Sequence, residues 1–207
     1  MNNKLHNINK QVLDRIYGHG RGWVFTPRHF DDLGGRSTVG TVLQRNKDAG
    51  IIRQLARGLY DYPRQHSELG VLSPSIDVIA LALKGRDAVR IQPSGAYAAN
   101  RLGLSDQVPM RVLFLTDGRS RTVQVGNQQI VLKRTTPRNM AAADRISGLL
   151  IQALRHLGQS HVDDDIIAKL DRKIDADTRK QLLKDARYAP AWIADIFRKL
   201  AFKVDKK

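Results

Sequence analysis

The sequence has no cysteine, only 6% aromatic residues, and no apolar run that approaches the length of a membrane span. The absence of cysteine excludes a disulfide framework and thiolate catalysis. The first ten residues, MNNKLHNINK, are polar and lack the apolar centre of a secretory signal. We therefore expect a cytoplasmic protein that does not associate with a membrane.

Recognisable metal and enzyme motifs are also missing. The six histidines are scattered, and no pair is spaced by four residues around a glutamate. The glycine-rich stretch Gly18–Gly22 lacks the Gly-Lys-Ser/Thr ending of a phosphate loop. Three acidic residues, Asp163–Asp165, stand before an apolar pair, which is typical of a helix start rather than a cation site. We expect no metal, no cofactor and no enzymatic activity.

Basic charge is abundant. The 207 residues contain 35 lysines and arginines against 20 acidic residues, a net charge of +15. Residues 1–70, 71–140 and 141–207 contribute +5, +6 and +4, so folded surfaces rather than one basic tail carry the excess. Such a balance predicts attraction to a polyanion, usually nucleic acid. A basic surface that serves only solubility is the alternative.

The first sixty residues show the element order of a winged helix-turn-helix. Apolar residues at helical spacing end at Tyr17, and a short apolar run follows at Trp23–Phe25. Helices are predicted at 28–33, after Thr26-Pro27, and at 36–49, after Gly34-Gly35. Two strand-like runs, 51–55 and 58–62, then form a hairpin. We assign residues 1–66 to this domain; a small α+β fold without a nucleic-acid role is the alternative.

The rest of the chain, 67–207, reads as a second domain. Its part from about 67 to 140 mixes helices with strands predicted at 88–92, 112–116, 122–125 and 129–133. From about 141 to 207 the apolar residues recur at helical spacing. The predicted fold class is therefore α+β, with an N-terminal winged helix-turn-helix, a mixed α/β domain and a helical C-terminal end.

The helix at 36–49 is the predicted DNA-reading element. Val39, Val42 and Leu43 share one side with Asn46, while hydroxyl, amide and guanidinium groups occupy the other. Such groups suit base edges and phosphates in the major groove. The hairpin behind it would act as a wing on the adjacent backbone or minor groove; its arginines could instead only keep an edge strand soluble. The predicted DNA contacts are Arg28, Arg36, Ser37, Thr38, Thr41, Gln44, Arg45, Lys47, Arg53 and Arg57.

Several segments resemble the AbiEi-type antitoxins of bacterial type IV toxin–antitoxin systems. They are RGLYDYP in the wing, then LSPS, QPSGAYAANRLGLSDQVP, FLTDG and YAPAWI further on. The resemblance implies that the winged helix binds inverted repeats of its own promoter and represses the operon. It also implies a C-terminal domain that counteracts an AbiEii toxin, which resembles a nucleotidyltransferase. Two half-sites would require a dimer or cooperative monomers.

Two alternatives stay open. The chain could be an interaction module that sequesters a toxin directly, with DNA binding incidental. Within the signature Pro93–Asn100, a structural turn and helix is the simpler interpretation. A Ser-Gly pair before a helix can also hold an anion, so a small-ligand site is possible there.

Overall fold

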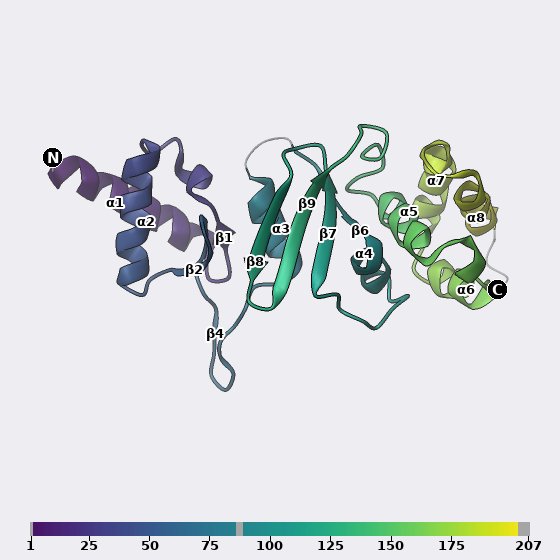
Figure 1. Ribbon diagram of the computed structural model, residues 1–207, viewed down its shortest axis with the longest axis horizontal. Helices are drawn as coiled ribbons and strands as arrows, with labels where there is room; N and C mark the ends of the chain where they lie inside the picture. The colour runs from purple at the N-terminus through teal and green to yellow at the C-terminus, as the bar shows by residue number, and fades with distance from the viewer. Residues whose placement is uncertain (1, 86–88, 203–207) are drawn as a thin grey trace. The chain divides into compact units, whose positions relative to one another are not determined.

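The computed structural model describes residues 2–85 and 89–202, with side chains from Leu5 onward, and its fold is α+β as predicted (Figure 1). The chain forms two compact units. The first comprises Met1–Val89 with Val123–Gly126, and the second comprises Arg90–Thr122 with Asn127–Lys207. The predicted end of the winged helix at residue 66 lies inside the first unit.

The first unit contains a winged helix-turn-helix. Three short strands form an antiparallel sheet in the order β1-β3-β2, and β2 and β3 are the hairpin that we call the wing. Helices α1 and α2 pack against each other (Figure 1). The elements in chain order are α1 Asn2–His19, β1 Val24–Phe25, the 3₁₀ helix η1 Pro27–Phe30, α2 Arg36–Asp48, β2 Arg53–Ala56 and β3 Leu59–Asp61.

Helix η1 is shorter than the predicted helix at 28–33. Thr26 caps it as expected, and Pro27 is its first residue. The His29 ring accepts a hydrogen bond from the Thr26 N–H, at 3.1 Å, so the side chain three residues on closes the first turn. Asp31, Asp32 and Leu33 continue as turns, which brings the chain to Gly34 after a single helical turn.

The core of this unit is built around two buried phenylalanines. Phe25 and Phe30 pack edge to face with ring centroids 5.4 Å apart, and Trp23 lies against both. The apolar side of α2 closes the core through Val39, Val42 and Leu43, all fully buried, as the helical pattern predicts. This packing fixes which side of α2 remains outside.

Two elements follow the wing. Residues 65–71 form a two-stranded finger, β4 Gln65–His66 and β5 Gly70–Val71, which the sequence did not predict (Figure 1). Helix α3, Ile76–Lys84, begins at Ser75, whose hydroxyl accepts a hydrogen bond from the Val78 N–H. The strand predicted at 88–92 is β6 Ile91–Ser94 in the structure; residue 88 lies outside the described residues.

The second unit contains a mixed sheet. Strands β6, β7 and β9 belong to this unit, with β7 antiparallel to β6 and parallel to β9, while the residues of β8 from Val123 on belong to the first unit. Phe114 and Ile130 face the core and are almost fully buried. The strands are β7 Arg111–Thr116, β8 Arg121–Val125 and β9 Gln128–Arg134.

The Thr116-Asp117-Gly118 stretch, part of the FLTDG segment, ties the end of β7 to the start of β6. Asp117 accepts hydrogen bonds from the backbone N–H and the Nε of Arg90, at 2.8 and 2.9 Å. The Thr116 hydroxyl donates to the Arg90 carbonyl at 2.8 Å. Burial opposes charge on Asp117, but the hydrogen bonds from Arg90 outweigh it and lower the pKa of this carboxyl.

Helices make up the rest of the second unit. The stripe predicted on the last helix is core, because Ile193, Phe197 and Leu200 are fully buried. Asp163 caps α6 by accepting from the Ile166 N–H at 2.9 Å, which confirms the helix-start interpretation of the acidic triplet. The helices are α4 Gly95–Arg101, α5 Ile146–Leu157, η2 Gln159–His161, α6 Asp164–Asp171, α7 Ala176–Asp185, η3 Ala186–Tyr188 and α8 Ala191–Phe202.

A buried carboxylate joins α5 to the end of α7. Asp185 is 2% exposed and accepts a hydrogen bond from the Ser147 hydroxyl. The Arg145 Nε lies 3.0 Å from the Asp185 Oδ2 without hydrogen-bond geometry, so their interaction is ionic. Arg145 therefore neutralises a charge that the helical core could not otherwise contain.

Candidate nucleic-acid interface

Helix α2 begins directly after a pair of glycines. A Cβ at Gly34 would lie 3.2 Å from the Ile8 Cδ1, so glycine allows the turn to pass close to α1. Gly35 is the N-cap and supplies no side-chain hydrogen bond. The N–H groups of the first turn of α2 therefore have no side-chain cap and suit an anion.

The outward face of α2 is polar. We use this name for its five exposed predicted residues, Arg36, Ser37, Thr41, Gln44 and Arg45. The other two predicted residues of the helix, Thr38 and Lys47, are partly buried. Among the described residues, the side chains of Arg36 and Arg45 form neither a salt bridge nor a hydrogen bond, so both guanidinium groups are available to a partner.

Two members of the outward face already have partners within α2. The Thr41 hydroxyl donates to the Ser37 carbonyl at 3.1 Å. The Gln44 amide donates to both carboxylate oxygens of Asp48, at 2.9 and 3.1 Å. Both pairs are exposed, so a base edge could displace them at small cost. The Gln44 contact also holds the carboxylate of Asp48 at the C-terminal end of the helix.

The two predicted arginines of the wing differ. Arg57 stands exposed at the tip, next to Gly58, which adopts the positive φ of +70° that the turn requires. Arg53 instead binds Asp61 across the hairpin, with Nε–Oδ1 and Nη2–Oδ2 distances of 3.1 and 2.7 Å. It also donates to the Leu72 carbonyl at 3.0 Å.

Arg53 therefore does not fit the predicted phosphate contact. Asp61 is 1% exposed, and its charge is compensated by this bidentate pair. Sequence reasoning missed Asp61, although a signal existed. Arg53 and Asp61 are cross-strand partners in the hairpin that turns at Gly58. Opposite charges at equal distances from a predicted turn indicate such a pair.

The remaining predicted contact, Arg28, lies exposed on η1, the helix before α2. The position of η1 is fixed by Arg15 of α1, whose guanidinium binds Asp32 at 2.8 and 2.7 Å. Arg15 also donates to the His29 carbonyl. The structure thus brings Arg28 and the outward face together on consecutive helices of one unit, and Arg57 on the wing of the same unit.

Among residues 2–85 and 89–202, no three His, Cys, Asp or Glu side chains are grouped so as to hold a metal ion. Within the same described ranges, no helix has the length and apolar content required to cross a bilayer.

Comparison with known proteins identifies one family. No curated protein matches the chain. A family model described as a family of unknown function, DUF6088, matches residues 11–182, which include α2, the wing, the mixed sheet and most of the C-terminal helices. The chain belongs to the DUF6088 family.

Proposed function

We propose that the protein binds double-stranded DNA through α2 and the wing, in the cytoplasm, as an AbiEi-type antitoxin that represses its own operon. The observation that carries this proposal is the outward face of α2. The guanidinium groups of Arg36 and Arg45 are exposed and unpaired among the described residues. The opposite side of the helix is buried in the core. A net charge of +15 adds a general attraction to the DNA backbone.

The roles within this interface follow from position. Arg45 and Gln44 would read base edges in the major groove, since Arg pairs bidentately with guanine and Gln with adenine. Arg36, near the uncapped N-terminus of α2, would bind phosphate. Arg57 would hold the adjacent backbone from the wing tip. Arg53 has no part in this proposal, because its guanidinium is already paired with the carboxylate of Asp61.

The DNA part is tested by fluorescence anisotropy with a duplex from immediately upstream of the protein's own gene and a scrambled duplex of equal composition. We expect tighter binding to the upstream duplex and a linear fall of log affinity with log salt concentration. Arg57→Ala should weaken both duplexes alike and reduce the salt slope by about 1. Arg119→Ala removes an exposed arginine of the second unit and is the control for the loss of one positive charge. Equal affinity for the two duplexes would refute sequence-specific repression.

The antitoxin part is tested by co-expression with the neighbouring gene, which we expect to encode a nucleotidyltransferase-like AbiEii toxin. The wild-type protein should restore growth. An Arg45→Ala, Arg57→Ala double variant, expressed from an unrelated promoter, separates the two roles. Restored growth with this variant would assign neutralisation to surfaces other than the DNA interface, and co-purification of the toxin would then support direct sequestration. Failure of the wild-type protein to protect would refute the antitoxin role.

A further inference from the structure

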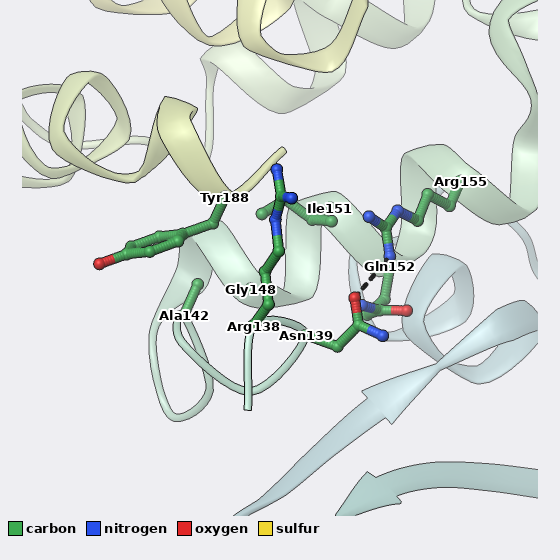
Figure 2. A pocket seen from close by; sticks show the side chains of 8 residues that line it. All are labelled: Arg138, Asn139, Ala142, Gly148, Ile151, Gln152, Arg155 and Tyr188. Carbon is green, nitrogen blue, oxygen red and sulfur yellow. Dashed lines mark hydrogen bonds between the residues drawn. The ribbon is translucent and has the colours of Figure 1, made fainter. Parts of the chain in front are cut away.

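A small hollow in the second unit carries a separate arrangement of polar side chains (Figure 2). Arg138 and Asn139 come from the segment after β9, and Gln152 and Arg155 from α5. Tyr188 of η3 stands on one side, and Gly148 with Ala142 lines the base. Figure 2 shows the Arg155 side chain reaching toward Asn139, with a dashed line that marks their hydrogen bond.

The lining is cationic without a counter-charge. It contains two guanidinium groups and no carboxylate or histidine. The Arg155 guanidinium makes one weak hydrogen bond, from Nη1 to the Asn139 Oδ1 at 3.4 Å, and the Arg138 guanidinium makes none within the described residues. This contrasts with Arg90 and Arg145 of the same unit, each of which faces a carboxylate. Two cations in one lining without an anion favour an anionic ligand.

The interior of the hollow is built by buried contacts. Gln152 is 5% exposed, and its Oε1 accepts a hydrogen bond from the Ser94 hydroxyl at 3.0 Å. With the oxygen occupied, the amide NH₂ of Gln152 is the group left to donate to a ligand. A Cβ at position 148 would meet the Ala142 carbonyl oxygen at 2.1 Å and the Gln92 Oε1 at 2.6 Å. Only glycine lets α5 close the base in this way.

We propose that this hollow binds a phosphate monoester, such as the terminal phosphate of a mononucleotide. Guanidinium groups donate paired hydrogen bonds that match phosphate oxygens, and the Gln152 amide adds a neutral donor. Because Gly148 and Ala142 close the base, a terminal group fits better than a backbone that must pass through. Ser94, from the PSG signature, acts as a positioning residue that orients Gln152. The inference is independent of DNA binding by α2.

Isothermal titration calorimetry on the full chain tests this site, with inorganic phosphate and AMP as probes and adenosine and acetate as comparison compounds. We expect saturable one-to-one binding of phosphate and AMP, and none of adenosine or acetate. Arg138→Ala and Arg155→Ala should each weaken AMP binding about 10-fold or more, as expected for loss of a charge-assisted hydrogen bond. Arg138→Lys and Arg155→Lys keep the charge but lose the paired donors, so their losses should be smaller.

Two controls keep the result interpretable. Arg119→Ala removes an equal charge from the same unit outside the hollow and should leave the AMP affinity unchanged. The affinity for upstream duplex DNA should be unchanged in Arg138→Ala, so a failure of this site and a failure of the DNA interface can be told apart. Absence of saturable binding by both phosphate probes would overturn the proposal. Unchanged AMP affinity in Arg138→Lys, Arg155→Lys and Arg138→Ala would also overturn it. Acetate binding as tight as phosphate binding would overturn it as well.

Discussion

Helix α2 with the wing tip and the packed C-terminal helices use arginine in opposite ways. On α2 and the wing tip, Arg36, Arg45 and Arg57 are exposed and form no salt bridge with any described residue. In the second unit, Arg145 and Arg179 hold carboxylates that belong to packed helices. The side chain is the same, so the difference lies in the partner: an arginine beside a buried carboxylate stabilises the fold, and one without a partner presents charge to solvent.

The wing shows both uses within one hairpin. Arg53 and Arg57 are four residues apart, yet Arg53 faces the buried Asp61 and Arg57 faces solvent. Composition alone does not separate these roles. The buried carboxylate partner of Arg53 separates them. The following variants test this distinction, from the largest expected effect to the smallest.

The largest loss of stability is expected for Arg145→Ala. The substitution leaves the carboxylate of Asp185 buried without its cation, which should lower the free energy of unfolding by about 3–5 kcal/mol. Urea denaturation followed by circular dichroism measures this change. Arg198→Ala is the control, because Arg198 pairs with Asp195 on the exposed side of α8 and should cost below about 1 kcal/mol. Equal losses for the two variants would contradict the distinction.

A loss of about 2–3 kcal/mol of unfolding free energy is expected for Arg53→Ala, because the substitution leaves the buried carboxylate of Asp61 without its bidentate partner. The Arg57→Ala variant of the same hairpin should have unchanged stability. Thermal unfolding of both variants, beside their salt-dependent DNA affinities, separates structure from binding. If Arg53→Ala kept full stability and lost DNA affinity as Arg57→Ala does, the contrast within the wing would be abolished.

Replacing Arg45 should affect binding and leave stability intact. Arg45→Ala removes a presented guanidinium and should weaken binding to the upstream duplex by about 1–3 kcal/mol if this side chain reads a base. The measurement is anisotropy on single-base variants of that duplex. Discrimination should relax at one position only. A uniform loss across all duplexes would instead place Arg45 on a phosphate.

The smallest effect depends on pH. The folded-state pKa of Asp117 is lowered, so its contribution to stability is present above the unfolded pKa of about 4 and is lost as pH falls through the folded value. Asp117→Asn should cost about 1–2 kcal/mol near pH 7, from the weakened hydrogen bonds with Arg90. Urea unfolding of both proteins at descending pH should show the difference shrinking below pH 4. A constant difference down to pH 2 would show that the charge of Asp117 is not responsible.

Local patterns predicted much of the architecture. The buried stripe of α2, the caps at Thr26 and Asp163, and the apolar strand β7 all follow from spacing and residue chemistry within a few positions. The length of helix η1 was overestimated because a Thr-Pro start marks where a helix begins and gives no information about where it ends. The finger β4–β5 was missed because neither of its two-residue strands is buried, so no hydrophobic alternation marks it.

Long-range partners were not predictable in the same way. Ser147 and Asp185, which share a hydrogen bond, are 38 residues apart, and only the folded helices bring them together. Ser94 and Gln152 meet across 58 residues for the same reason. The candidate DNA residues on α2 needed only helical periodicity. The pairing of Arg53 needed only the cross-strand register of the predicted hairpin, whereas the hollow around Arg155 needed the tertiary structure.

The buried amide of Asn46 influences which side of α2 is exposed on the first unit. Asn46 is 4% exposed and donates to the Asn9 Oδ1 of α1 and to the Val42 carbonyl, each at 2.9 Å. Together with the packing of Val39, Val42 and Leu43, this contact fixes the rotation of α2 about its own axis. Under the proposed function, that rotation would decide which side chains meet a duplex, so exchange of Asn9 would change the preferred sequence although Asn9 itself touches no nucleotide.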